Sequence, residues 1–305
     1  MRSNMLVSVI TTTYNRDKLL LRLFNTLQKQ SNYNFEWIVI DDGSDKKFQE
    51  VFSKIERTET IFKKRIFHQC NQGKHAALNN AFNHIKGEVT VIIDSDDIVL
   101  PNTIDTIIKK WTNSRLADPT LAAIIFEKGT ESGEPLNIIK DNNKRANINQ
   151  YRYFNNLNGD LAETYKSSII KKYHFPVQKN EKFLSEDYVW IDIGRKYDAI
   201  FYHQILYQTK YLSSGLTHDI HQIMWKNPIG SLMNTEKRVG IRVPFKLQIK
   251  FNIMFEIFVR RNKLSLTKEL RKTKYPKLAV VLWPVSFLVY CYYHLKYGEK
   301  NDEAN

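Results

Sequence analysis

Cysteine is nearly absent from this 305-residue chain, which contains only Cys70 and Cys291. Two cysteines are too few for a disulfide framework and lack the spacing of a metal site, so a reducing, cytoplasmic location is expected. Glycine and proline are also sparse, at 11 and 8 residues. With 42% hydrophobic residues, this composition excludes collagen-like and disordered chains, and the chain is long enough to bury a core without covalent staples.

Long apolar runs are lacking too, with one exception near the C-terminus. Residues 278–295 contain no charged side chain, and a helix of this length reaches roughly 27 Å, just short of a hydrocarbon core of about 30 Å. Pro284 lies within the run and counts further against a spanning helix. A polytopic membrane protein is therefore excluded. Two interpretations of the run stay open: a buried C-terminal helix, or an anchor that lies in, or re-enters, an anionic membrane face.

Acidic residues are outnumbered, with 32 Asp and Glu against 46 Lys and Arg and a net charge of +14. The excess is concentrated between Lys237 and Lys277, where 13 Lys and Arg face two acids, Glu256 and Glu269. We expect residues 236–305 to form a basic, helical C-terminal extension. Basic side chains attract anionic lipid, so this extension is expected to place the protein peripherally on the inner face of the cell membrane. A nucleic-acid partner is not expected, because no DNA- or RNA-binding motif accompanies the charge.

The N-terminal half alternates between two periodicities. Apolar β-branched runs predict buried strands, and apolar residues spaced i, i+3, i+4 and i+7 predict helices between them. The predicted strands cover residues 7–12, 35–40, 65–69, 89–93 and 121–126, and the predicted helices follow Asn15, cover 48–55 and 78–85, and start at Pro101. This order predicts an α/β fold with a Rossmann-like, mostly parallel central sheet and helices on both faces. Ligands of such sheets bind beyond the carboxyl ends of the strands.

Three acids follow the fourth predicted strand, in the segment Asp94-Ser95-Asp96-Asp97. Asp94 and Asp96 are two residues apart and face the same side of an extended chain. Neighbouring carboxylates repel one another unless a cation neutralises them. Mg²⁺ or Mn²⁺, held jointly with ligand phosphates, would do so. The alternative is a solvated turn in which Asp97 caps the next helix.

Two further segments lie at or near strand ends. Asp41 and Asp42 end the second strand, where an Asp can accept a hydrogen bond from the N–H of a pyrimidine base or form a turn and helix cap. Lys74 stands at or near a predicted helix N-terminus, the electropositive end that suits phosphate. A surface lysine without a ligand is the alternative there.

The segments VSVITTTYNR, IVIDDGS, NQGKHAALNNA and VIIDSDD, in this order, resemble the family 2 glycosyltransferases over roughly residues 5–112. FLSEDYVW at 183–190 is similar to a later acidic motif of that family. The resemblance implies the GT-A fold and a non-processive, inverting transferase. Such an enzyme would move a sugar from a UDP- or dTDP-sugar to a lipid-linked saccharide or glycan acceptor in surface polysaccharide synthesis. We place the catalytic domain at 1–235, with the nucleotide-sugar-binding half at 5–128 and the acceptor half at 129–235.

The resemblance also implies roles for single residues. The residues expected to bind the donor are Thr12, Tyr14, Asp41, Asp42, Lys74, Asp94 and Ser95. Asp94 and Asp96 would form the DxD pair, with Asp96 holding Mn²⁺ or Mg²⁺ on the diphosphate. Asp187 would be the general base, with Glu186 beside it, although a helix cap is an alternative for this pair. His218 would be a late metal ligand, and His221 is an equal candidate.

Other interpretations are weaker. Residues 222–225, QIMW, are one residue short of the Gln-x-x-Arg-Trp motif of processive members and lack its Arg. A nucleotidyltransferase would share the sheet and the metal carboxylates, but it needs a Gly-rich phosphate loop, and VSVITTTYNR contains no glycine. A non-catalytic membrane or nucleic-acid adaptor would leave the acids at the strand ends unexplained. An oligomer is compatible with the sequence.

Overall fold

The computed structural model describes residues 5–112, 116–157, 159–209, 220–265, 270 and 273–298. The chain forms two compact units. The first, called here the sheet unit, comprises residues 1–176 and 193–211. The second, the helical unit, comprises residues 177–192 and 212–305. The domain boundary expected after residue 235 falls inside the helix α9 (Pro228–Val239). The two units instead divide after residues 176, 192 and 211.

A mixed sheet forms the centre of the sheet unit. Its strands are β1 (Val7–Thr13), β2 (Phe35–Asp41), β3 (Lys63–His68), β4 (Val89–Ile92), β5 (Asp97–Val99), β6 (Leu121–Thr130), β7 (Lys144–Asn147), β8 (Leu161–Lys166) and β9 (Asp198–Thr209). The order is β3-β2-β1-β4-β8-β6-β9-β5, and β7 pairs with β9. The neighbouring strands β3, β2, β1 and β4 run parallel to one another, and β6 runs parallel to β9. The strand β8 runs antiparallel to β4 and β6, and β5 and β7 run antiparallel to β9. The α/β prediction is confirmed. Parallel pairing joins β1 through β4 and also β6 to β9, while antiparallel pairing joins the other neighbours in the sheet.

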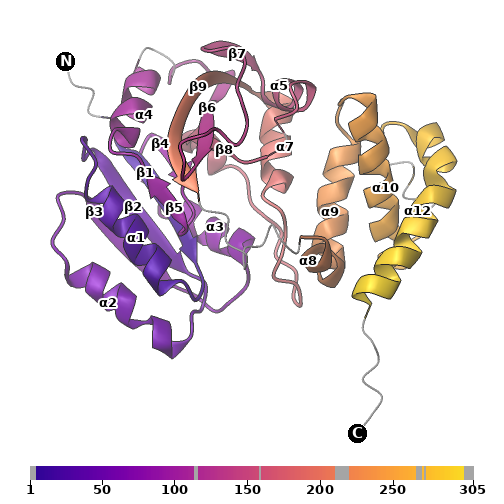
Figure 1. Ribbon diagram of the computed structural model, residues 1–305, viewed down its shortest axis with the longest axis horizontal. Coiled ribbons are helices and arrows are strands. Elements are labelled where there is room, and N and C mark those ends of the chain that lie inside the picture. Colours follow the sequence, from indigo (N-terminus) through magenta and orange to yellow (C-terminus); the bar gives the residue numbers. More distant parts are fainter. Residues whose placement is uncertain are drawn as a thin grey trace, which may run out of the picture. The chain divides into compact units, whose positions relative to one another are not determined.

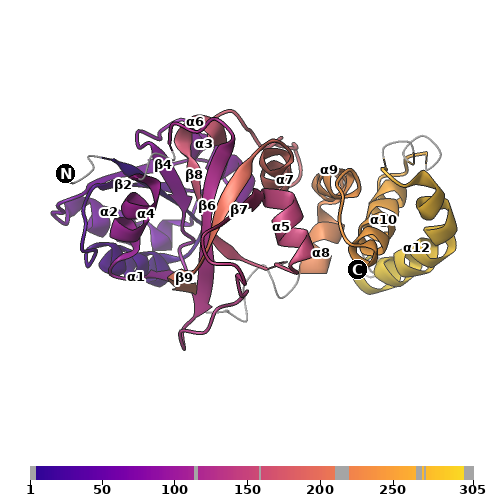
Figure 2. The same ribbon diagram turned by 90° about the horizontal axis from the view of Figure 1, so that it is seen from above.

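Helices cover both faces of this sheet. On one face lie α1 (Asp17–Leu27), α2 (Glu50–Arg57), which follows a short 3₁₀ turn, and α4 (Thr103–Thr112). Figure 2 shows α3 (Lys74–Phe82) and α6 (Ser167–Ile170) on the opposite side from α1. A further helix, α5 (Ile148–Phe154), follows β7. The core under α1 contains Phe24 stacked on Trp37, with ring centroids 5.6 Å apart. These layers fix the carboxyl ends of β1, β2 and β4 at one edge (Figure 1).

The helical unit contains the start of α7 (Asp187–Lys196), then α8 (Ile220–Lys226), α9, α10 (Phe245–Arg261) and α12 (Pro276–Tyr297). Within it, α10 packs against both α9 and α12 (Figure 1). A polar contact joins α10 and α12: the Ser286 hydroxyl donates to the Glu256 carboxylate and accepts from Arg260 at 3.0 Å. The helical prediction for the C-terminal region is confirmed.

The helix α12 is longer than its uncharged run. Its 22 residues correspond to about 33 Å, and the helix continues through Pro284. Pro284 therefore does not interrupt the helix, and whether it disfavours a membrane span stays a prediction. By length and composition alone α12 could cross a membrane, and 17% of its most apolar window is buried. That small fraction argues against the interpretation as a buried core helix, because core helices are covered on most sides.

Candidate active site at the carboxyl edge of the sheet

The acidic segment after β4 is a closed turn that leads into β5. The Asp97 N–H donates to the Asp94 carbonyl oxygen at 3.0 Å, and the Asp94 N–H donates to Asp97 Oδ2 at 3.2 Å. Asp97 is the first residue of β5, and the next helix begins only at Thr103. The alternative in which Asp97 caps a helix is therefore wrong. The turn holds three carboxylates at the edge where ligands of parallel sheets bind.

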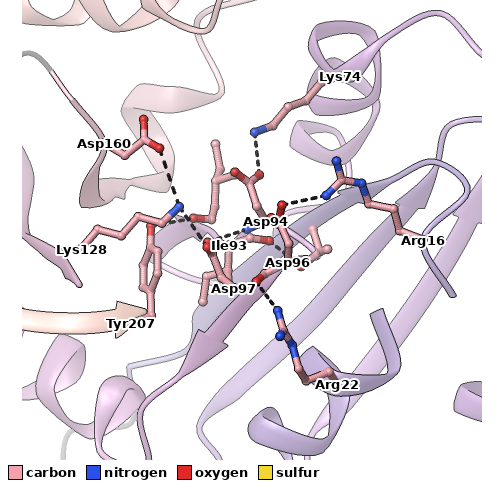
Figure 3. Close-up of polar contacts among 12 residues, drawn as sticks. Arg16, Arg22, Lys74, Ile93, Asp94, Asp96, Asp97, Lys128, Asp160 and Tyr207 are labelled. Carbon is pink, nitrogen blue, oxygen red and sulfur yellow. Dashed lines mark hydrogen bonds and ion pairs between the residues drawn. The ribbon is translucent and has the colours of Figure 1, made fainter. Parts of the chain in front are cut away.

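Each carboxylate of this turn lies against a cation from a different element (Figure 3). The ion pairs are Asp94–Lys74 at 2.6 Å, Asp96–Arg16 at 2.7 Å and Asp97–Lys128 at 3.0 Å. Lys74 is the first residue of α3, Arg16 immediately precedes α1, and Lys128 lies in β6. A fourth cation, Arg22, donates to the backbone oxygen of Asp96 at 2.5 Å. Three layers of the fold therefore converge on one turn.

The pair between Lys128 and Asp97 is buried, with side chains 6% and 1% exposed. Burial raises the pKa of the Asp97 carboxyl, and Lys128 only partly offsets this. For Lys128, burial lowers the pKa of the ammonium, but Asp97 and Asp94 raise it by more, so the group stays charged. The Lys128 ammonium also lies 5.5 Å from the ring centre of Tyr207, another buried residue. This pair is part of the core.

The other two pairs are accessible. The side chains of Lys74 and Asp94 are 28% and 35% exposed, and those of Arg16 and Asp96 are 26% and 21% exposed. Partial burial raises the pKa of the Asp94 carboxyl, but Lys74 and other cations lower it by more, so the net shift is downward. Asp94 is therefore an ionised carboxylate that a ligand can reach. Lys74 forms an ion pair with Asp94, so the alternative of a surface lysine without contacts does not apply.

Two carboxylates are a sparse donor set for a metal ion. Among the residues that the structure describes, no group of three or more His, Cys, Asp and Glu side chains is arranged to hold one. Asp94 and Asp96 nevertheless fit Mg²⁺ or Mn²⁺, because such ions are usually held by one or two carboxylates together with substrate phosphates and water. The residues present thus suit a metal that arrives with a diphosphate.

The two histidines considered as metal ligands have separate outcomes. His218 lies outside the described residues. His221 belongs to α8 of the helical unit, where its Nδ1 lies 3.0 Å from the Tyr293 hydroxyl. Burial, with nearby Lys250 and Lys296, lowers the pKa of the His221 imidazole. A ligand role for either stays a prediction.

Asp41 is almost fully buried at the end of β2. Its carboxylate accepts from the Ser44 N–H at 3.0 Å and from Gln49 Nε2 at 3.3 Å, and it lies 2.9 Å from His68 Nδ1. A carboxylate has about four lone-pair positions, so these contacts leave room for one more donor. Binding of a base N–H by Asp41 stays a prediction.

Asp42 has a different task. Its carboxylate accepts from Gln69 Nε2, the Gln72 N–H and the Gly73 N–H at 2.8, 2.9 and 2.8 Å. Gly73 has φ of 93° and directly precedes α3, so Asp42 fixes the loop that aims Lys74. This arrangement gives Asp42 a positioning role and makes it a weaker candidate for the base than Asp41.

The end of β1 supplies the remaining donor-site candidates. Thr12 is 8% exposed, Tyr14 is 45% exposed, and Ser95 in the acidic turn is 4% exposed. Asn15 adopts φ of 53°, and its N–H donates to the Ser44 hydroxyl at 2.8 Å. This left-handed turn joins the ends of β1 and β2 and leaves Tyr14 accessible. The structure thus brings the sheet-unit candidates to one edge, while their roles stay predictions.

Asp187 and Glu186 belong to the helical unit. Asp187 is the first residue of α7, its side chain is 31% exposed, and Arg238 of α9 donates to its carboxylate. One turn further along α7, Asp192 pairs in the same way with Lys237 at 2.5 Å. The contact with Arg238 places a cation beside the Asp187 carboxylate, and a nearby cation favours the ionised form that a general base requires.

Sequence reasoning missed Arg16, Lys128 and Arg238. Arg16 lies inside the quoted VSVITTTYNR segment, but no local pattern pairs it with Asp96, 80 residues away. Lys128 is a charge at the end of an apolar strand, which is the one local signal that marks it as a buried ion-pair partner. Arg238 lies in a run of basic residues that carries no such signal.

Comparison with known proteins gives a consistent result. An uncharacterized glycosyltransferase of Methanocaldococcus jannaschii is 30% identical over 193 residues, covering 61% of this chain and 63% of that protein. A Campylobacter jejuni GalNAc(5)-diNAcBac-PP-undecaprenol beta-1,3-glucosyltransferase is 25% identical over 192 residues, covering 62% of this chain and 60% of that protein. The chain thus spans about three-fifths of these two curated relatives.

Among solved structures, S. aureus TarS 1-349 in complex with UDP-GlcNAc superimposes with a TM-score of 0.63 at 16% identity, covering 96% of this chain and 89% of that chain. This likeness shows the fold and confirms the GT-A architecture. Residues 8–171, more than half of the chain, match Glycosyl transferase family 2. The chain therefore belongs to glycosyl transferase family 2.

Proposed function

We propose that the protein transfers a sugar from a UDP- or dTDP-sugar to a lipid-linked saccharide or glycan acceptor. The observation that carries this proposal is the turn of residues 94–97, where two accessible carboxylates and two accessible cations meet at the carboxyl edge of the sheet. Family membership makes glycosyl transfer the class of reaction. A nucleoside diphosphate needs both kinds of group, because cations contact its oxygens and carboxylates hold its metal.

The donor is proposed to lie along the ends of β1, β2 and β4. Asp41 would accept the N–H of the pyrimidine, with Thr12 and Tyr14 lining the base. Lys74 stands at the N-terminus of α3, where the helix dipole adds to its attraction for the diphosphate. Asp96, with Asp94, would hold Mn²⁺ or Mg²⁺. Such an ion stabilises the negative charge on a departing diphosphate.

Transfer is proposed to proceed with inversion in a single displacement. The acceptor oxygen forms a bond to the anomeric carbon while the bond from that carbon to the diphosphate breaks, and the acceptor hydroxyl proton passes to the Asp187 carboxylate. The neighbouring Arg238 guanidinium favours the ionised carboxylate. Glu186 precedes Asp187 and is the second acid of this segment. What supports this assignment is the guanidinium beside the carboxylate that would accept the proton.

A lipid-linked acceptor at the cytoplasmic membrane face accounts for α12. Its exposed apolar residues are Val280, Val281, Trp283, Val285, Phe287, Leu288, Tyr292 and Leu295. Soluble proteins seldom expose such a contiguous patch unless it meets a partner or a membrane. The name of the C. jejuni relative contains an undecaprenol diphosphate acceptor, which supports a lipid-linked acceptor here and a role in surface polysaccharide synthesis.

Release of free nucleoside diphosphate tests the proposal. The full chain is incubated with Mn²⁺, acceptor lipid and a panel of UDP- and dTDP-sugars, and UDP or dTDP is measured against time. We expect release that depends on Mn²⁺ or Mg²⁺ and is lost in Asp96→Asn, since removal of a metal ligand costs several kcal/mol of transition-state stabilisation. A parallel incubation with a nucleoside triphosphate and a sugar 1-phosphate tests the alternative, because a nucleotidyltransferase would release pyrophosphate from these reactants. Release of neither nucleoside diphosphate nor pyrophosphate would indicate an adaptor.

A further inference from the structure

The carboxylates proposed to hold the metal are already paired in the protein alone. Asp96 Oδ2 lies 2.7 Å from Arg16 NH1, and Asp94 Oδ1 lies 2.6 Å from Lys74 Nζ. The two cations come from the N-terminal ends of α1 and α3, which lie on opposite sides of the sheet (Figure 2). Each cation occupies a lone-pair position of an oxygen that a metal ion would use, and it would also place a like charge beside the metal. The intact pairs therefore oppose metal binding.

The electrostatic balance of the edge makes the same point. In the network of ion pairs and hydrogen bonds around the 94–97 turn, the acids are Asp94, Asp96, Asp97 and Asp160, and the cations are Arg16, Arg22, Lys74 and Lys128. The formal charges cancel, so a divalent ion alone would add two uncompensated positive charges. A diphosphate alone would meet carboxylates beside its cations. Metal and diphosphate together bring charges that offset one another.

The pairs differ in their ability to exchange partners. Arg16 and Lys74 are about a quarter exposed, and their long side chains can turn about their stems. Arg16 and Lys74 both lie at the N-terminus of a helix, where the helix dipole attracts an anion and repels a cation. This end of each helix therefore suits the binding of a diphosphate. Lys128, in contrast, is buried against Asp97. If Lys128 moved away, the Asp97 carboxylate would remain as an unpaired charge in the core, which is costly.

We propose that Arg16 and Lys74 are exchangeable counter-ions, which hold Asp96 and Asp94 in the absence of donor and turn to the diphosphate when the metal takes those carboxylates. This inference rests on the proposed function for the identity of the diphosphate ligand. It assigns a role to Arg16 and makes the binding of metal and nucleotide mutually dependent. By linkage, each ligand then raises the affinity for the other by the same factor.

The test uses Mn²⁺ alone, UDP alone and both together, each titrated into the full chain by calorimetry, with free Mn²⁺ followed by electron paramagnetic resonance. In the wild type we expect weak Mn²⁺ binding alone and an enhancement by UDP of about 5- to 150-fold, the usual range for coupled sites. In Arg16→Gln and in Lys74→Met, Mn²⁺ alone binds several-fold more tightly, because a carboxylate is released. UDP with Mn²⁺ binds more weakly, because a diphosphate contact is lost.

A matched control is Lys109→Met. Lys109 lies in α4 of the same unit, is 73% exposed, and pairs with Asp105. The change removes the same charge away from the turn, so both affinities are expected to stay at wild-type values. Thermal unfolding of each variant verifies that the fold is retained.

Three outcomes separate the ideas. Unchanged or weaker Mn²⁺ binding in Arg16→Gln and Lys74→Met would overturn the counter-ion role, whatever UDP does. An equal gain in Lys109→Met would overturn it as well, because net charge would then be the cause. If Mn²⁺ binds more tightly to both site variants while the wild type binds neither UDP nor dTDP with Mn²⁺, the exchange with carboxylates stands, and the diphosphate ligand and the proposed function fail.

Discussion

The carboxyl edge of the sheet and the outer side of α12 present opposite kinds of side chain. At the sheet edge each carboxylate of the 94–97 turn lies beside a cation, and the charges cancel. On α12, Val281, Leu288 and Leu295 are 73%, 69% and 85% exposed. A balanced, polar edge suits a ligand that brings its own charges, whereas an exposed apolar helix suits an apolar partner.

This contrast separates two tasks between the units. The sheet unit has the groups proposed to recognise a charged donor, and the helical unit has the predicted base and the surface proposed for a lipid-linked acceptor. The separation fails if a change in the helical unit alters donor affinity, or if a change at the sheet edge alters membrane binding.

The largest effect is expected for Asp187→Asn. The amide is nearly isosteric but cannot take the acceptor proton, so the rate of transfer falls by about 10² to 10⁴, while the affinity for UDP with Mn²⁺ stays unchanged. Stopped assays of transfer and calorimetry of UDP measure the two quantities. Asp192→Asn is the matched control, because Asp192 lies on the same helix and also pairs with a cation. A loss of UDP affinity in Asp187→Asn would make it a donor-site residue.

The next largest effect concerns the two kinds of ion pair at the sheet edge. Lys128→Met leaves the Asp97 carboxylate in the core without its cation, and such losses cost about 3–5 kcal/mol of unfolding free energy. Lys74→Met removes an accessible pair and is expected to cost less than about 1 kcal/mol. Urea unfolding of both variants measures the difference. Equal costs would show that burial does not distinguish the pairs.

For α12 we expect a smaller, purely binding effect. Leu288→Asp changes an exposed side chain, so stability is retained, but affinity for anionic vesicles falls by about 10- to 100-fold, as for the loss of one buried Leu. Flotation with anionic and neutral liposomes at rising salt measures it. Ile61→Asp is the control, since Ile61 is 78% exposed but lies in the sheet unit. Equal loss in both variants, or no vesicle binding by the wild type, would remove the membrane proposal.

The strands that sequence analysis located are those with a strong local signal. Residues 7–13 and 35–41 are buried at every position, so both faces of each strand are apolar enough to be recognised. The strands β7, KRAN, and β8, LAETYK, are short or polar. They form because distant strands offer them pairing edges, and local propensity contains no information about such an edge.

The site was predictable to a similar degree. Asp94 and Asp96 directly follow an apolar strand, so their place at the sheet edge could be inferred from the chain itself. Their partners Arg16 and Lys74 come from other elements, and such pairs depend on how the layers pack. The resemblance to a family supplied the roles, while the pairing of each acid with its own cation required coordinates.

The smallest effect is expected where α10 meets α12. Burial raises the pKa of the Glu256 carboxyl, although the Ser286 hydroxyl and Arg260 lower it in part. The folded state therefore holds a proton more tightly than the unfolded state, so this group's contribution to stability is present below the unfolded pKa and is lost as pH rises through the folded pKa.

Glu256→Gln removes this dependence while its side-chain oxygen can still accept from Ser286. We expect the melting temperature of the variant, relative to wild type, to rise by no more than a few degrees between pH 4 and pH 7.5. Scanning fluorimetry across that range measures it. If the difference in melting temperature between variant and wild type stays constant with pH, Glu256 is ionised to the same extent in the folded and unfolded states. Its contact with α12 would then be no more desolvated than the accessible ion pairs of the sheet edge.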